Sequence, residues 1–198
     1  MRVCSKLAYL AWWLAKRSVG MDFIKKNLAV IISVGAAFVA FVLAIFLPGA
    51  TAELGSGAKA DANLLGMMFG SATITQKAGS MTATMTYKGA MSIFGLLSFL
   101  CLIAGIGLNV ASIFIKDKNF DFIGSVLIAV AGVLVFLLLV AGTDLTAVVI
   151  NGNTQTGKSK FKDVYEIWKL GAGTYIYGIL AILGGGFGVA NKFLGIVK

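Results

Sequence analysis

Histidine is absent from the 198-residue chain, charged residues make up only 13% of it, and it contains a single proline. Without histidine, imidazole acid–base catalysis and histidine metal ligands are excluded. Soluble domains contain about 25% charged residues, so this chain is not an ordinary soluble domain. The 25 glycines follow no collagen-like G-X-Y period, and glycine is frequent in membrane helices.

The two cysteines, Cys4 and Cys101, lie in the N-terminal tail and in the middle of an apolar run, so we expect no disulfide between them. The net charge of +9 could indicate nucleic-acid binding. However, the basic residues lie between the apolar runs rather than along one face, which favours attraction to anionic lipid. We therefore expect a lipid bilayer as partner, and no nucleic acid.

Four long intervals of the sequence carry no Asp, Glu, Lys or Arg; they are 26, 27, 22 and 22 residues long. The first contains Leu28–Leu47, whose uncharged residues would form a helix about 30 Å long, the thickness of the hydrocarbon core of a bilayer. The intervals predict four membrane spans within one domain, residues 27–198. The spans are expected at about residues 28–47, 91–115, 122–143 and 171–191.

Two features near the N-terminus leave alternatives open. Ala50 and Ala52, before Glu53, have the form of a signal-peptidase site, but the apolar run exceeds the usual 7–15 residues, which favours a retained span. Residues 1–26 are expected to be a cytoplasmic tail. Within it, Leu7–Ala15 is either a short interfacial helix or a segment that precedes a true start at Met21.

The density of lysine and arginine indicates the orientation. The segments 1–26, 116–121 and 192–198 carry ten such residues in 39 positions, whereas 53–88 and 144–169 carry seven in 62. We therefore expect a multi-pass protein of the plasma membrane with both termini in the cytoplasm. Its two larger loops, 53–88 and 144–169, would lie outside.

Both outer loops contain sequence patterns that are typical of β-strands. Residues 69–76 and 80–87 predict a hairpin, because apolar residues alternate with threonines in the period of two that half-buried strands have. Residues 53–63 are expected to be a polar, flexible approach to it. In the second loop, 145–150 predicts a third strand and 161–170 a short amphipathic helix. The outer-loop contact candidates are the apolar and aromatic residues Phe69, Met81, Met85, Tyr87 and Trp168.

One motif suggests nucleotide binding. Residues 152–159, GNTQTGKS, satisfy the GxxxxGK[ST] pattern of phosphate-binding loops. Such a loop needs a parallel sheet behind it and an acidic strand for Mg²⁺, for which this connection has no room. We therefore expect no nucleotide and no other cofactor. Asp163 and Glu166, beside lysines, indicate a solvated helix face, so an enzyme is not expected.

Small residues recur within the spans and let helix backbones approach closely in lipid. They favour packing within one bundle over self-association. Ionisable residues are missing from the spans, which argues against ion or proton transport. Asn109 is the strongly polar candidate, and we expect it to form a hydrogen bond between helices. The candidates for helix packing or an interface are Gly105, Asn109, Gly178, Ala181, Gly184 and Gly188.

In topology the chain resembles the claudin-like four-span membrane proteins, with a large β-containing first outer loop. The claudin tryptophans and loop cysteines are absent from this loop, so the resemblance is one of topology. In composition and in the pattern of its apolar runs, the chain is similar to small uncharacterised four-span proteins of Gram-positive bacteria. The matching features are KKNLAVIISVGAAFVAFVLAIFLPG, the threonine-rich loop and KLGAGTYIYGILAILGG, within about residues 21–191. This resemblance implies a fold and no functional residue.

The expected fold is an all-α transmembrane protein, a left-handed four-helix bundle with a small extracytoplasmic β-hairpin or three-stranded sheet. The expected function is that of an integral membrane scaffold, an accessory subunit or a self-associating envelope protein. It would contact another membrane protein or a second copy of itself through its outer loops and glycine-rich helix faces. The alternative is a transporter or channel component with a pathway near Asn109.

Overall fold

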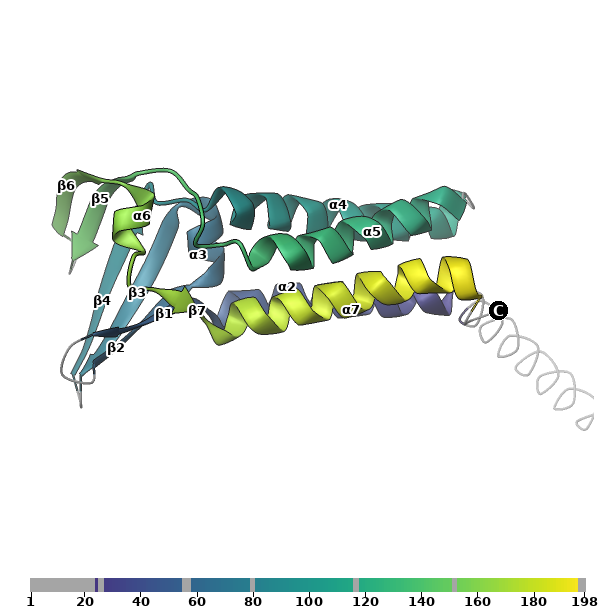
Figure 1. Ribbon diagram of the computed structural model, residues 1–198, viewed down its shortest axis with the longest axis horizontal. Coiled ribbons are helices and arrows are strands. Elements are labelled where there is room, and N and C mark those ends of the chain that lie inside the picture. Colours follow the sequence, from purple (N-terminus) through teal and green to yellow (C-terminus); the bar gives the residue numbers. More distant parts are fainter. Residues whose placement is uncertain are drawn as a thin grey trace, which may run out of the picture.

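The computed structural model describes residues 24, 27–54, 58–78, 81–115, 118–150 and 153–195. Four long helices lie side by side, and a β-sheet covers one end of them (Figure 1). The long helices are α2 (Leu28–Phe46), α4 (Ile93–Ile115), α5 (Lys118–Val135) and α7 (Ala172–Leu194). The strands are β1 (Pro48–Leu54), β2 (Ala58–Asn63), β3 (Ser71–Ala78), β4 (Met81–Lys88), β5 (Leu145–Ile150), β6 (Asn153–Ser159) and β7 (Lys169–Leu170). Two short helices, α3 (Leu64–Phe69) and α6 (Phe161–Val164), lie at the sheet end.

The structure is an α+β fold, and the predicted all-α four-helix bundle is wrong. The sheet is a seven-stranded antiparallel open sheet, and strands make up 27% of the structure. The difference arises largely in β1 and β2, because the sequence predicted a flexible approach over residues 53–63 and no strand before it. Their inward-facing side chains are alanines, such as Ala52 and Ala60, and alanine is neither strongly apolar nor a strand former. Burial against the rest of the molecule decides their conformation.

Three helices, α2, α4 and α7, are long and apolar enough to cross a membrane, which fits a membrane protein. The sequence predicted four spans, and the third of them, residues 122–143, does not form one long helix. Instead α5 begins at Lys118 and ends at Val135, and it is shorter than the three candidate spans.

Beyond Val135 the backbone hydrogen bonding changes, and a residue distant in sequence contacts this stretch. The backbone N–H groups of residues 136, 137, 138 and 140 bond to carbonyls three residues back, in tighter turns than an α-helix makes. A carbonyl in this stretch has a further partner, because the Ser92 hydroxyl donates to Leu138 O at 2.6 Å. These turns extend the chain to the level at which α4 begins.

The strand order is β6-β5-β4-β3-β2-β1-β7, and each neighbouring pair is antiparallel. The predicted hairpin is confirmed as β3 and β4, and the predicted third strand is confirmed as β5, which pairs with β4. The predicted amphipathic helix over 161–170 is only partly right. Its first turn forms α6, whereas Lys169 and Leu170 pair with β1 and close the other edge of the sheet.

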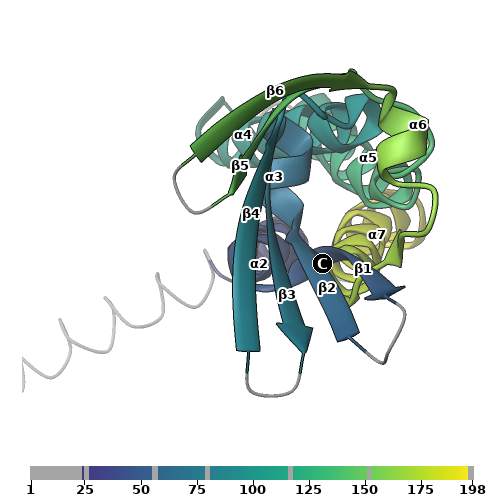
Figure 2. The same ribbon diagram turned by 90° about the vertical axis from the view of Figure 1, so that its left-hand side faces the viewer.

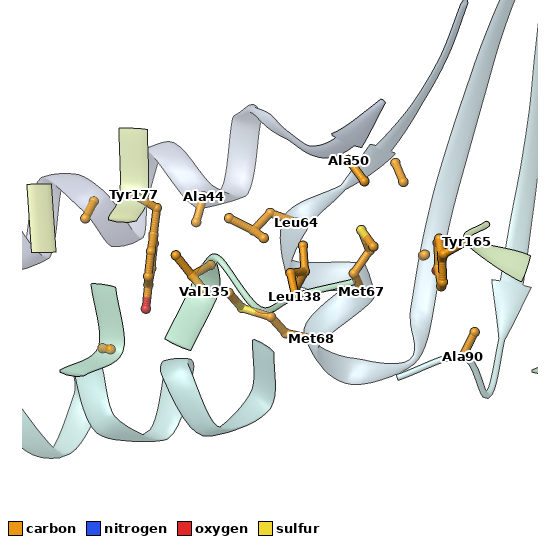
Figure 3. Packing of buried hydrophobic residues seen from close by; sticks show 14 of the residues in the cluster. Ala44, Ala50, Leu64, Met67, Met68, Ala90, Val135, Leu138, Tyr165 and Tyr177 are labelled. Carbon is orange, nitrogen blue, oxygen red and sulfur yellow. The ribbon is translucent and has the colours of Figure 1, made fainter. Parts of the chain in front are cut away.

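The short helix α3 joins the sheet to the long helices. Leu64, Met67 and Met68 of α3 are fully buried. Figure 3 shows these side chains between the ends of the long helices, near Ala44 and Leu138, and the sheet. Because this core is continuous from bundle to sheet, the helices hold the sheet in a fixed position.

The predicted tail helix in residues 1–26 lies outside the described residues apart from Ile24, and so do both candidate starts, Met1 and Met21. Ala52, after which a signal peptidase would cut, is buried within β1 and pairs with Ala60. Since α2 also packs along α7, the first span and β1 are integral parts of this fold.

Candidate functional site

The glycine-rich face of α7 lies inside the bundle. Gly178, Ala181 and Gly184 are buried. A Cβ placed on Gly184 would lie 2.6 Å from the Cβ of Ala36 on α2, and one on Gly178 would lie 2.6 Å from Cε2 of Phe136, just after α5. Because side-chain atoms do not approach this closely, these positions need glycine. The chain's own helices therefore occupy the surface that the sequence offered to a partner.

Asn109 of α4 lies where the four long helices meet. Its side chain is fully buried, and its amide donates to Ser33 Oγ of α2 at 3.4 Å. The Ser125 hydroxyl of α5 lies 3.5 Å from Asn109 Oδ1, to which it donates, and Gly188 of α7 packs on Ser125. The expected hydrogen bond between helices is confirmed.

Gly105 marks the close crossing of α4 and α5. A Cβ on Gly105 would lie 2.7 Å from the carbonyl oxygen of Gly124, and one on Gly124 would lie 2.7 Å from Asn109 Oδ1. The sequence indicated Gly105 but not Gly124, because Gly124 has no small partner four residues away in the regular pattern. Glycine is required at position 124 by residues of α4, and not by a pattern within α5.

We expect Asn109→Ala to destabilise the protein by about 1–2 kcal/mol, because Ser33 and Ser125 lose their polar partner in a buried site. Combining it with Ser33→Ala should cost less than the sum of the two single changes. Unfolding in detergent measures both effects. Strictly additive losses would contradict coupling through this hydrogen bond.

A second buried polar contact was not predicted. The Ser98 hydroxyl of α4 donates to Ala131 O of α5 at 2.7 Å and lies 3.1 Å from the hydroxyl oxygen of Tyr177 on α7. Tyr177 has the largest of the fully buried side chains among the described residues. The sequence could have indicated this contact, because a tyrosine within an apolar span has a hydroxyl that needs a hydrogen-bond partner when it is buried.

Two of the five outer-loop contact candidates, Met85 and Tyr87, lie on the inner face of the sheet, which packs on α3. Met85 pairs with the buried Ile74, so it shares that face, and Tyr87 also packs against the buried cluster. Trp168 likewise packs against this cluster, with its ring 5.9 Å from that of Tyr165.

The two remaining candidates differ. Phe69 is exposed and stands edge-on to Phe99 of α4, with the ring centroids 4.9 Å apart. For Met81, only the backbone is described, and it pairs with Ala78.

The outer face of the sheet, which turns away from α3, carries threonines in rows across the strands. One row follows paired residues from β1 to β4, and the other follows them from β3 to β6. Paired residues on neighbouring strands lie about 5 Å apart, and alternate residues along one strand about 7 Å apart. Figure 2 looks onto the sheet from this side. The rows are Thr51–Asp61–Thr75–Thr84 and Thr73–Thr86–Val149–Thr154.

Three aromatic rings cover the inner side near α6. The ring of Tyr165 lies next to the rings of Phe161 and Trp168. The ring centroids of Tyr165 and Phe161 are 4.7 Å apart. The Tyr165 hydroxyl is buried and has no hydrogen-bond partner. Burial raises the pKa of this hydroxyl well above its ordinary value of about 10, and the nearby Tyr87 raises the pKa further.

We expect Tyr165→Phe to stabilise the protein by about 1 kcal/mol at neutral pH, because it removes a buried hydroxyl that has no partner. The gain should grow above pH 10. There the unfolded wild-type chain releases this proton while the folded chain keeps it, so wild-type stability falls as the pH rises. Unfolding at pH 7 and pH 11 tests this. A loss of stability on substitution would show that the hydroxyl has a partner.

The phosphate-loop match and the acidic pair Asp163 and Glu166, which were assigned no function from the sequence, do not form a site in the structure. Residues 153–159 of the phosphate-loop match form β6, an exposed antiparallel edge strand, and not a turn between a strand and a helix. Asp163 and Glu166 are both exposed. Within the part of the chain that the structure describes, no three Cys, Asp or Glu residues are placed to hold a metal ion.

The chain matches no model of a known protein family, and a comparison with curated proteins finds no match either.

Proposed function

We propose that this chain is a membrane-anchored interaction protein, a scaffold or accessory subunit, whose contact surface is the outer face of the sheet. The threonine rows are the observation that carries the proposal. They present hydroxyl and methyl groups at regular spacing across β1 to β6, and Thr84 and Thr154 are exposed. Helix α3 supports the sheet from behind, so the surface is formed before a partner binds, which lowers the cost of binding.

The proposed location is the plasma membrane, with the sheet outside and both termini in the cytoplasm. The long helices all meet the sheet at the same end (Figure 1), and in the sequence lysine and arginine are sparser in the two loops that contain the sheet than in the other segments between the apolar runs. Residues 118–140 return the chain from the inner turn to the sheet, beside α4 and α7. We propose that they cross the membrane there with the three longer helices.

The remaining candidate contacts have less support. The glycine-rich face of α7 packs on α2 and α5, so self-association through it would require those helices to separate. A transport pathway near Asn109 would need space, and a Cβ on Gly124 would already lie 2.7 Å from Asn109 Oδ1. Both observations favour a structural role for the bundle interior.

The test is photo-crosslinking in intact cells with benzoylphenylalanine at Thr84, with the probe at Ala83 as matched control. Both residues are exposed on β4, but they lie on opposite faces. We expect a discrete adduct from position 84 and much less from position 83. An adduct of twice the chain mass would identify a second copy as the partner, and another mass would identify a different protein. No adduct at 84, or equal adducts at both positions, would overturn the proposal.

A further inference from the structure

An open pocket of about 320 Å³ lies where the turns after α5 meet α6, away from the threonine rows. The N–H of Ile93 donates to Ala141 O at 3.1 Å, so the pocket lies at the level where α4 begins. This level is the boundary between the apolar helices and the polar sheet. Figure 2 shows α6 in front of the end of α5. The pocket is lined by Val140, Ala141, Gly142, Asp144, Lys160, Phe161 and Lys162.

The pocket lining contains two lysine ammonium groups and one aspartate carboxylate, and the carboxylate already accepts a hydrogen bond from the backbone. Lys160 and Lys162 are exposed, and neither forms an ion pair with any residue that the structure describes. Asp144 lies beside the segment that carries them, because its Oδ1 accepts a hydrogen bond at 3.3 Å from the N–H of Phe161, the residue between the two lysines. The lining thus carries a net positive charge, which is complementary to a phosphate group.

The side of the pocket toward the helices is apolar. Val140 is 62% exposed, and the exposed surface continues through Leu137 in the turns after α5 to Val133 and Val130 on α5. Their spacing of three to four residues places them in one stripe along these turns and the helix. A ligand that fits both parts has a phosphate at one end and hydrocarbon at the other.

We propose that this pocket binds the headgroup of an anionic phospholipid from the leaflet on the sheet side. The phosphate lies between Lys160 and Lys162, and an acyl chain follows the stripe from Val140 to Val130. This inference requires the membrane location but no partner on the threonine rows. It therefore stands or falls separately from the proposed contact surface.

The test uses the full chain in detergent, with native mass spectrometry counting bound phosphatidylglycerol or phosphatidylcholine of the same chain length. We expect the wild type to retain phosphatidylglycerol preferentially. The double variant Lys160→Ala, Lys162→Ala should bind it about 10- to 30-fold more weakly, since each lysine near the surface contributes about a factor of five. The matched control is Lys59→Ala, Lys88→Ala, which removes the same charge from exposed positions on the outer face and should bind as the wild type does.

Two further arms distinguish a lipid site from general attraction to positive charge and from a site for free phosphate. Asp144→Asn keeps an acceptor oxygen for Phe161 N–H and removes a negative charge, so it should strengthen phosphatidylglycerol binding. Inorganic phosphate at millimolar concentration should not displace the lipid, because it lacks an acyl chain. Equal losses in both lysine pairs, equal retention of the two lipids, weaker binding in Asp144→Asn, or displacement by free phosphate would overturn the proposal.

Discussion

Replacement of Gly185 by alanine should prevent stable packing of α7 against α5. A Cβ at this position would lie 2.5 Å from the carbonyl oxygen of Ser125 and would also clash with the backbone nitrogen of Ala129. Backbone atoms cannot rotate away as a side chain can, so the two helices must move apart. Overpacking of this kind costs about 1–3 kcal/mol and often more, and the displaced helices lose further contacts along their length. The thermal midpoint in detergent and the share of monodisperse protein measure the loss.

Gly186 is the matched control, one residue further along the same helix. A Cβ there would meet nothing within 4 Å. Because alanine favours a helix over glycine by about 1 kcal/mol, Gly186→Ala should leave stability unchanged or raise it slightly. Equal destabilisation by the two substitutions would contradict the packing of α7 described above.

Tyr177→Ala should be the most destabilising change of a single side chain in the bundle. The ring is fully buried, and its removal leaves a cavity of aromatic size between the helices. Losses for such truncations are about 3–5 kcal/mol in soluble proteins, and lost packing dominates in lipid as well. Unfolding in detergent gives the change in free energy directly.

Two further variants distinguish the contribution of the Tyr177 ring from that of its hydroxyl and from the general effect of replacing a tyrosine on α7. Tyr177→Phe keeps the ring, and Ser98 keeps its hydrogen bond to Ala131 O, so we expect a loss of only about 1 kcal/mol. Tyr175→Ala, on the exposed side of α7, should have a small effect. If Tyr177→Phe were as damaging as Tyr177→Ala, hydrogen bonding rather than packing would dominate at this site.

The positions of the long helices could largely be predicted from charge. The first span was expected from residue 28 and begins at Leu28, and the last was expected from 171 and begins at Ala172. Charge spacing could not show where regular helical bonding ends, because partners distant in sequence decide that at residue 136. The resemblance to four-span proteins stays a prediction.

The sheet could be predicted only where apolar residues alternate with polar ones. The residues of β3, β4 and β5 show this alternation, whereas the alanines of β1 and β2 do not. The strand β7 has only two residues and exists because Leu170 lies beside Ala50 in the folded chain. Such a pairing depends on the whole fold, so no local pattern could indicate it.

The same alternation could not show which face of the sheet the rest of the chain covers. Met85 and Tyr87 were expected to face a partner, whereas they lie on the inner face of the sheet, and Thr86 between them lies on the outer face. The fold has its own use for the apolar side, because α3 and the aromatic residues near α6 cover it. A sequence shows that a strand has two different faces, but only the covering elements show which one remains outside.

The central claim is that the sheet lies outside the membrane and is held there by helices within it. Accessibility of single cysteines to a membrane-impermeant maleimide tests it most directly, with Cys4 and Cys101 replaced. Ser159 on β6 and Asn119 at the start of α5 are exposed at opposite ends of the molecule. A cysteine at 159 should react in intact cells, and one at 119 only after permeabilisation. Reaction of both in intact cells, or protection of 159 until the membrane is opened, would contradict the account.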